Sequence, residues 1–267
     1  MSTEKIWFVT GVADGLGLAL VRMLLDQGHK VAATSRDVDA LLDAVDAKLE
    51  GRFLPLEVNL ADEGSVRRAV DSAVAAFGRI DVVVNNASHG LPGALEMLSD
   101  AALRSSFDIN VFGVLNVVRA VMPRLRAQRA GHVFNISSIL GFDGGSAGWG
   151  AYSAAKFAVS GLSEALAAEA APHGVRVSLV YPGAMRAQAD GSRPEAGIGH
   201  AACSDPTKAA RALIQAAHAQ YAPLHLFLGR DAFDQARGKI QSVQQELARW
   251  REMSVSIGFV DERRLAA

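Results

Sequence analysis

The 267-residue sequence predicts an α/β fold, a doubly wound parallel sheet of about seven strands with helices on both faces. Short β-branched runs alternate with longer amphipathic segments along the chain. Runs such as "DVVVN" (81–85) and "HVFNIS" (132–137) are apolar on both faces, as are strands buried between two helical layers. Half of the residues are apolar and no linker breaks the alternation, so we expect a single domain over residues 1–267.

The expected elements follow one another regularly. The β-branched runs predict strands at residues 5–10, 30–34, 53–58, 80–85, 131–137, 175–181 and 224–228. The amphipathic segments predict helices near residues 16–27, 38–49, 62–77, 99–127, 152–171, 206–219 and 231–253. Because crossovers between parallel strands are right-handed, these helices fall on both faces of the sheet.

Two segments near the end of the chain depart from this order. Residues 184–204 are rich in Gly, Ala and polar residues and follow the sixth strand, beyond whose carboxyl end ligands bind in such sheets. We expect a substrate loop or lid there, with a plain surface loop as the alternative. The last helix carries an apolar stripe that is too short to argue a coiled coil, so we expect it to pack on its own domain. The stripe is formed by Phe233, Ala236, Ile240, Val243, Leu247 and Trp250.

Composition excludes several classes of function. The formal net charge is −1 without a block of like charges, so neither nucleic acid nor anionic lipid is an expected partner. The single cysteine, Cys203, excludes an internal disulfide, and no Cys or His cluster has metal-ligand spacing. The N-terminal apolar run is too short for a signal peptide, and no stretch approaches the roughly 18 apolar residues of a membrane span. We therefore expect a soluble, cytoplasmic protein without a metal site.

The stretch "TGVADGLG" (10–17) has the pattern of a phosphate-binding turn. Gly11 ends the first strand, where the chain must turn sharply, and Gly15 and Gly17 open the next helix. Backbone N–H groups and the helix dipole can then face a pyrophosphate. Glycine-rich turns are common, so the pattern gains its weight from its place after the first strand. Asp14 puts a negative charge into this turn.

The second strand ends in "ATSRD" (33–37), at the position that meets the adenosine ribose in dinucleotide-binding folds. An acid there binds the 2′-hydroxyl, whereas an Arg accommodates a 2′-phosphate. Arg36 therefore favours NADP(H), with NAD(H) possible, unless it is an ordinary solvated residue at a helix start. Asp14 argues against a 2′-phosphate. We expect Arg36 to prevail, because its planar fork can grip the phosphate directly.

The stretch "YSAAK" (152–156) places Tyr152 and Lys156 on one face of a helix. A phenol with its usual pKa near 10 is a poor acid–base catalyst at neutral pH, and an adjacent ammonium favours the phenolate. Such a pair alone often only packs on a helix surface. Here Ser138 ends the fifth expected strand, and Asn110 lies within the long helical segment before it.

Taken in order, these motifs resemble the short-chain dehydrogenase/reductase family. The matching set is T-G-x-x-x-G-x-G at 10–17, N-N-A at 85–87, Asn110, Ser138, Y-x-x-x-K at 152–156 and P-G at 182–183. The resemblance covers about residues 5 to 183 and is specific because the motifs occur in order. It implies a Rossmann-type domain, a homodimer or homotetramer, and an oxidoreductase that interconverts a carbonyl and a secondary alcohol with a nicotinamide cofactor.

The resemblance also implies a role for each site residue. Tyr152 would exchange a proton with the substrate oxygen, Lys156 would lower the Tyr152 pKa and hold the nicotinamide ribose, and Ser138 would orient the substrate oxygen. Asn110 would hold a water that feeds protons toward Lys156. The expected cofactor-binding residues are Gly11, Asp14, Gly15, Leu16, Gly17, Arg36, Asn59, Leu60, Asn86, Ala87, Lys156, Pro182 and Met185.

Several positions depart from the family pattern. Ser88 replaces a usual Gly, Ala187 stands where a Thr often contacts the carboxamide, and Asn59 takes the place of an Asp that meets the adenine. These departures suggest, as one alternative, a non-catalytic or regulatory binding protein. A serine hydrolase that uses Ser146 of "GGSAG" (144–148) is a second alternative. For an oxidoreductase we expect an apolar or aromatic substrate, because several apolar or aromatic residues lie near the predicted reacting end. These residues are His89, Leu140, Phe142, Trp149 and Met185.

Overall fold

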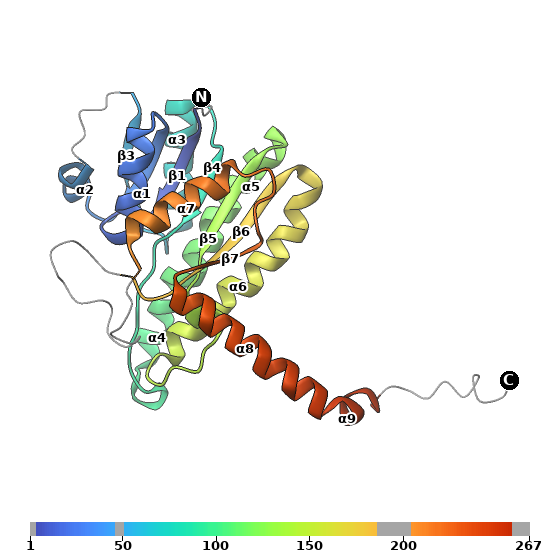
Figure 1. Cartoon of the computed structure of the whole chain (residues 1–267). Helices are drawn as coiled ribbons and strands as arrows, with labels where there is room; N and C mark the ends of the chain where they lie inside the picture. Colours follow the sequence, from blue (N-terminus) through green and yellow to red (C-terminus); the bar gives the residue numbers. More distant parts are fainter. Residues whose placement is uncertain (1–3, 46–50, 186–203, 258–267) are drawn as a thin grey trace.

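The computed structural model describes residues 4–45, 51–185 and 204–257, and it confirms the predicted α/β fold. Its centre is a seven-stranded sheet with the order β3-β2-β1-β4-β5-β6-β7, in which every pairing is parallel (Figure 1). The strands lie close to their predicted positions. They are β1 (Ile6–Thr10), β2 (Lys30–Ser35), β3 (Phe53–Glu57), β4 (Val82–Asn85), β5 (Gly131–Ile136), β6 (Val175–Pro182) and β7 (His225–Leu228).

The predicted helices are present, and two of them are divided. The segment expected as one helix over 99–127 is α4 (Asp100–Phe107), a π-helical turn (Asp108–Phe112) and α5 (Gly113–Gln128). The helix predicted at 231–253 forms α8 (Arg230–Arg249) and α9 (Arg251–Val255), which are separated at Trp250. The other helices are α1 (Gly15–Asp26), α2 (Val38–Val45), α3 (Glu63–Phe77), α6 (Gly150–Ala170) and α7 (Pro206–His218). The end of the helix predicted at 38–49 and most of the loop predicted at 184–204 lie outside the described residues.

Two layers of helices bury the two faces of the sheet. On one face, Trp7 and Val9 of β1 join a cluster with α1 and α7. On the other face, Phe8 of β1 joins a cluster with α3 and α5. Successive residues of a strand point to opposite faces, and here both faces are buried. This is why the strand sequences are apolar throughout rather than alternating.

The run from Asp100 to Gln128 is long and apolar enough, by length and composition, to cross a membrane, with a mean hydropathy of 1.2. This differs from the expectation that no stretch approaches that length. Half of the run is buried inside the protein, where α5 packs through Val117, Val121 and Leu125 on the sheet. The core helix of a soluble protein passes the same test.

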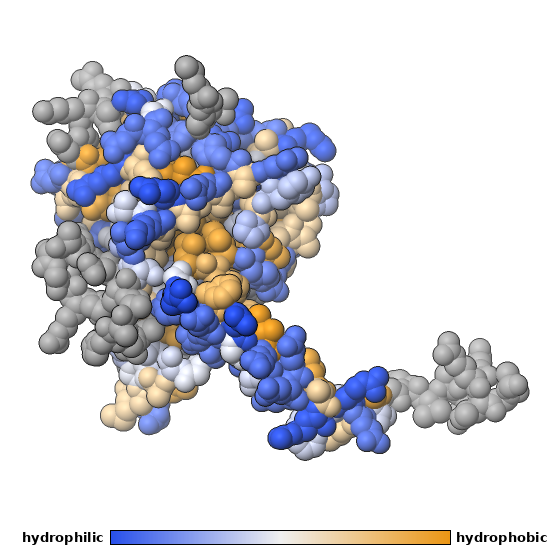
Figure 2. Space-filling view, viewed as in Figure 1, coloured by the Kyte–Doolittle hydropathy of each residue, from blue (hydrophilic) through white to orange (hydrophobic). Residues whose placement is uncertain are grey.

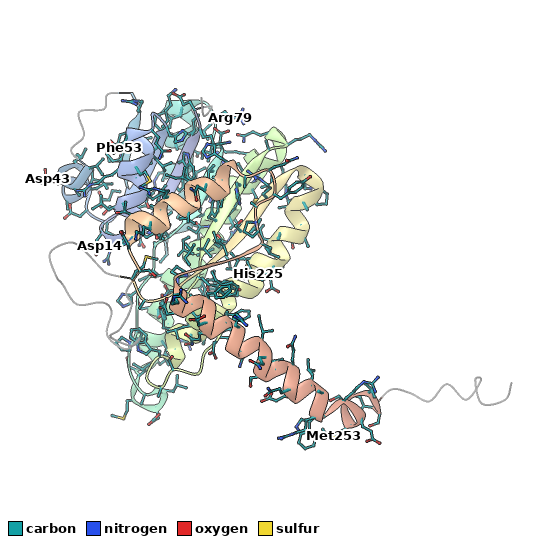
Figure 3. The ribbon with its side chains drawn as sticks, in the orientation of Figure 1. Asp14, Asp43, Phe53, Arg79, His225 and Met253 are labelled. Atoms are coloured by element: carbon teal, nitrogen blue, oxygen red, sulfur yellow. The ribbon has the colours of Figure 1, made fainter. Side chains whose placement is uncertain are left out.

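The expectation that the last helix packs along its own domain is wrong. Only Ala232 and Ala236 of α8 are buried, against Ile139 and the rings of Phe142 and Phe227. Beyond this buried contact the helix extends away from the body, as Figure 1 shows. Met253 lies at the far end of the projecting segment (Figure 3). The helix crosses the edge of the sheet beside β7, where the body offers no further surface to cover its apolar stripe.

One buried histidine makes folding sensitive to acid. His132 of β5 is almost fully buried, its Nε2 lies 2.9 Å from the Ser178 hydroxyl, and burial lowers its pKa from 6.5 to about 3. The unfolded chain therefore binds a proton below pH 6.5 that the folded chain does not bind until near pH 3. Protonation in this interval favours unfolding.

We therefore expect the free energy of unfolding to fall by about 2 kcal/mol from this residue alone between pH 6.5 and pH 5. Urea unfolding of the wild type and of His132→Gln at both pH values measures the effect. The variant should be less stable at pH 6.5 but lose less stability on acidification. Since burial also lowers the pKa of His29, the acid-dependent loss should shrink and not vanish. Equal losses in the two proteins would contradict the assignment.

Candidate active site

A cleft of about 680 Å³ lies at the carboxyl ends of the central strands. The strand order reverses between β1 and β4, which is where open α/β sheets bind their ligands. Most of the residues predicted for the site line this cleft. They are Gly11, Asp14, Gly15, Leu16, Arg36, Asn59, Leu60, Asn86, Ala87, Ser138, Tyr152, Pro182 and Met185. Gly17, Asn110 and Lys156 are buried behind its wall.

The glycine turn packs directly against the turn after β4. Gly11 has a φ of +69°, and a Cβ at this position would lie 2.4 Å from the Ala87 Cα. A Cβ on Gly17 would lie 2.5 Å from the Gly11 carbonyl oxygen and 2.6 Å from the Asn86 Nδ2. That amide nitrogen donates a hydrogen bond of 2.8 Å to the Gly11 carbonyl. Close backbone approach therefore requires glycine at both positions.

Thr10 holds the same two turns together, and the sequence analysis did not single it out. Its hydroxyl accepts hydrogen bonds from the backbone N–H of Asn86 (3.1 Å) and of Ala87 (3.2 Å). The hydroxyl itself donates to the Val84 carbonyl at 3.4 Å. The signal was present in the sequence, since Thr10 is a polar residue that closes an apolar strand just before the glycine turn.

The first turn of α1 offers its backbone donors to the cleft. The side chain of Asp14, the N-cap residue, accepts no capping hydrogen bond and is exposed. Gly15 has a φ of +52°, and its missing Cβ faces open space. The N–H groups at the start of a helix of this length carry a positive partial charge. The cradle therefore fits a dinucleotide pyrophosphate. Backbone N–H groups would hold it, so an exposed acid at position 14 is compatible with the turn.

Asp14 and Arg36 lie on the same wall of the cleft, and both are exposed. Within the described ranges no ion pair joins them, and Arg36 faces the cleft as an exposed residue. Ser35 accepts the Asp37 N–H at 3.1 Å, which fixes the start of α2 beside Arg36. Asn59 also lines the cleft, and its Oδ1 accepts the Ala61 N–H at 3.1 Å. The second lone pair of that oxygen can accept a further hydrogen bond.

Lys156 is placed beneath Tyr152 by the sheet. Its side chain is 1% exposed, and its Nζ donates a hydrogen bond of 2.9 Å to the carbonyl of Ile136 at the end of β5. The same nitrogen lies 5.5 Å from the centroid of the Tyr152 ring. A buried ammonium beside a phenol favours the phenolate electrostatically. The geometry therefore suits a phenol that exchanges a proton with a ligand in the cleft.

Ser138 lines the cleft together with Tyr152, and Asn110 is buried behind the cleft wall. Ser138 follows β5, and its Oγ accepts the Leu140 N–H at 3.2 Å, which orients the hydroxyl oxygen at the cleft wall. Asn110 lies in the π-helical turn, a local irregularity that often marks functional positions. Its Nδ2 donates to the His89 carbonyl at 2.8 Å, and its Oδ1 accepts the His89 N–H at 2.9 Å. The predicted water-holding role stays a prediction.

Four of the five residues predicted near the reacting end line the cleft. They are His89, Leu140, Trp149 and Met185, and the Trp149 ring meets the Tyr152 ring edge-on at 5.8 Å. Phe142 was wrongly included. It packs edge-on against the rings of Tyr181 and Phe227 on the other side of the loop after β5, at 5.6 Å and 5.1 Å. Those rings supply a larger apolar surface than the solvated cleft does.

Ser146 lacks the setting of a hydrolase nucleophile. Such a serine lies on a tight turn that joins a strand directly to a helix. Here β5 ends at Ile136, a short 3₁₀ turn (Ile139–Gly141) follows, and Ser146 lies in the loop that leads to α6. The Ser146 carbonyl accepts the Trp149 N–H at 3.2 Å, which is an ordinary turn.

Asp231, in the first turn of α8, holds the base of the predicted substrate loop. Its Oδ2 accepts the Ala184 N–H at 2.7 Å, and a Cβ on Gly183 would lie 2.2 Å from its carboxylate. Met185 and Ser204 form a parallel β-bridge just beyond. Sequence reasoning missed Asp231 because it is far from residue 184 along the chain.

The family assignment follows from the match to the family described as short chain dehydrogenase, which covers residues 5–197. The chain belongs to the short-chain dehydrogenase/reductase family. Among similar proteins, an oxidoreductase of Botryotinia fuckeliana is 34% identical over 94% of this chain and 98% of its own length. A 3-ketodihydrosphingosine reductase of Bacteroides thetaiotaomicron is 41% identical over 67% of this chain and 63% of its own length.

Solved structures of the family agree with this. A short-chain dehydrogenase from Streptomyces avermitilis has a TM-score of 0.89 and 35% identity, covering 96% of this chain and 100% of that one. A short-chain dehydrogenase from Burkholderia cenocepacia in complex with NADP has a TM-score of 0.76 and 29% identity, covering 93% and 98%. This short-chain dehydrogenase/reductase is thus an NAD(P)-dependent oxidoreductase.

The packing around Gly17 predicts that Gly17→Ala weakens cofactor binding. The new Cβ must push apart the Gly11 carbonyl and the Asn86 amide, and overpacking of this kind costs about 1–3 kcal/mol. Titration with NADPH, followed by fluorescence, should show a higher Kd, and the melting temperature should fall. Gly238→Ala is the matched control, since that helical glycine has open space around it and should keep wild-type affinity. Unchanged NADPH affinity in Gly17→Ala would contradict the cradle.

Proposed function

We propose that this enzyme interconverts a carbonyl and a secondary alcohol on a small apolar or aromatic substrate. The observation that carries the proposal is the position of the Lys156 ammonium. It is buried, its Nζ lies 5.5 Å from the centroid of the Tyr152 ring, and Tyr152 lines the same cleft as Ser138. A buried ammonium is held by hydrogen bonds and by nearby negative charge, and here the Ile136 carbonyl accepts one such bond. The Tyr152 phenolate that forms when the proton is transferred is the charge that this ammonium would stabilise.

In the direction of reduction, the Tyr152 hydroxyl gives its proton to the substrate oxygen as the C–O double bond becomes a single bond. When bound, the nicotinamide supplies the hydride that adds to the carbonyl carbon, or accepts it in the reverse direction. The Ser138 hydroxyl donates a hydrogen bond to the same substrate oxygen and fixes its position beside Tyr152. Lys156 holds the resulting phenolate until solvent returns the proton.

The apolar walls of the reacting end support an apolar substrate. Leu140, Trp149 and Met185 offer few hydrogen-bonding groups beside Tyr152, so polarity is confined to the atoms that react. The name of the Bacteroides thetaiotaomicron relative gives a ketone on a sphingoid chain as its substrate. An apolar ketone is therefore the substrate class to test first.

Arg36 supports a preference for NADP(H), with NAD(H) as a usable second cofactor. Its exposed guanidinium lines the cleft at the end of β2, where a 2′-phosphate would lie. Asp14 on the same wall repels that phosphate but is screened by solvent. The NADP complex of the Burkholderia cenocepacia relative is in keeping with this choice.

Tyr152→Phe should lower kcat by about 10²- to 10⁴-fold, because it removes only the group that exchanges the proton. The Kd for NADPH should stay close to that of the wild type. The assay follows nicotinamide absorbance over a panel of apolar ketones. Tyr181→Phe is the matched control, because it also removes a buried phenolic hydroxyl, but from a ring that does not line the cleft. A Tyr152→Phe enzyme with wild-type kcat would refute the mechanism.

Arg36→Ala should lower the ratio of kcat/KM for NADPH to that for NADH by about 10- to 100-fold, the worth of a charge-assisted hydrogen bond. Asp14→Ser should raise the ratio, since it removes the opposing charge. The ratio of the two Kd values provides a readout independent of turnover. Arg67→Ala, which removes an exposed Arg of α3, is the control. If Arg36→Ala leaves both ratios unchanged, Arg36 is a solvated helix-start residue.

A further inference from the structure

The first turn of α8 is joined to the chain segment that leaves β6. The Asp231 Oδ2 accepts the Ala184 N–H at 2.7 Å, and the Gly183 N–H donates at 2.9 Å to the Leu228 carbonyl at the end of β7. The buried residues of α8 lie in its first two turns, and the rest of the helix projects from the body (Figure 2). The contact therefore ties this segment to the part of α8 that the body fixes.

Glycines on both segments make the space for the Asp231 carboxylate. A Cβ on Gly183 would lie 2.2 Å from each of the two carboxylate oxygens. A Cβ on Gly229, which has a φ of +109°, would lie 2.5 Å from the Asp231 Oδ1 and 2.5 Å from the Ser204 Oγ. A side chain at either position would displace the carboxylate, so the contact depends on glycine at both.

One oxygen of this carboxylate is buried without a hydrogen-bond donor. Among the described residues, nothing donates to the Asp231 Oδ1. A buried carboxylate oxygen without a donor costs stability, so the stability of the fold is a poor explanation for an acid at this position. The backbone segment that Oδ2 holds gives a better one.

The segment held by Asp231 forms a wall of the cleft beside the reacting groups. β5 and β6 pair in register, with Ile136 beside Val180, so the chain leaves β6 next to Ser138. Residues 182–185 line the cleft, as do Ser138 and Tyr152. Hydride has to reach the carbon whose oxygen exchanges a proton with Tyr152, which places the nicotinamide of a bound cofactor at this end of the cleft.

We propose that Asp231 is a positioning residue for the nicotinamide half of the cofactor. By accepting the Ala184 N–H, it fixes residues 182–185 as a wall against which the nicotinamide binds. The proposal rests on the proposed function, because hydride transfer is what requires the nicotinamide beside Tyr152. Other residues form the pyrophosphate cradle at the start of α1, so Asp231 acts on one half of the cofactor and not on the other.

The test compares the affinity of each cofactor with that of the same molecule without its nicotinamide. Calorimetric titration of the full-length chain gives Kd values for NADPH and 2′-phospho-ADP-ribose, and for NADH and ADP-ribose. Asp231→Ala should raise the Kd of both intact cofactors by about tenfold, the worth of a hydrogen bond to a charged group, and leave the truncated molecules unchanged. Asp231→Asn keeps an oxygen that can accept the Ala184 N–H and should restore the wild-type ratio. Asp234→Ala, which removes an exposed carboxylate of the same helix, is the control.

Gly183→Ala tests the same contact with Asp231 still in place. The new Cβ has to displace the carboxylate, so the Kd of the intact cofactors alone should rise by about the same factor. In the Asp231→Ala background this change should add little, because the group that it displaces is gone. Equal effects of Gly183→Ala in the two backgrounds would overturn the proposal. So would an Asp231→Ala chain in which intact and truncated molecules weaken by the same factor, or in which neither weakens.

Turnover separates this proposal from the proposed reaction. With a ketone that is reduced, Asp231→Ala should raise the KM for the cofactor by a larger factor than it lowers kcat, because α6 and β5 hold Tyr152 and Ser138. If no ketone or alcohol is turned over but the Kd ratios change as expected, the positioning role stands without the reaction. If ketones are reduced and Asp231→Ala keeps the wild-type Kd ratios, KM and kcat, Asp231 only joins two segments of the fold.

Discussion

The contact between the turn after β1 and the turn after β4 is the constraint on which the rest of the cleft depends. The Asn86 amide and the Thr10 hydroxyl join the two turns with hydrogen bonds, and the missing side chains of Gly11 and Gly17 allow the backbones to meet. Because the strand order reverses here, no strand fills the crevice above the contact. The first turn of α1 is thereby held with its N–H groups toward the cleft.

The catalytic pair depends on the sheet in a different way. Lys156 reaches through the protein interior from α6 to the last carbonyl of β5, and this hydrogen bond fixes the height of its Nζ beneath Tyr152. Ser138 follows the same strand two residues later. The end of β5 therefore sets the positions of the ammonium and the serine hydroxyl, and α6 places the phenol beside the ammonium. Groups that are far apart in the sequence are thereby brought to one cleft.

The sequence was sufficient to predict the strands and the Tyr152–Lys156 pair, because both depend on patterns within a short stretch of the chain. Strands buried on both faces read as continuous apolar runs, and Tyr152 with Lys156 must share a helix face. Contacts between distant segments were beyond its reach. Tertiary packing produces the hydrogen bond from the Ala184 N–H to Asp231. It also produces the aromatic cluster that holds Phe142 away from the cleft. The π-helical turn at Asn110 was missed because the apolar pattern continues through it.

The last helix shows why a pattern alone does not specify its partner. The apolar spacing of α8 is equally compatible with packing on its own domain and with packing on a neighbour. The shape of the body decides how much of α8 is covered. The body ends beside β7, and among the described residues of α8 it buries only Ala232 and Ala236. The first turn of α8 accepts the Ala184 N–H through Asp231, at the base of the predicted substrate loop, while its far turns carry the uncovered stripe.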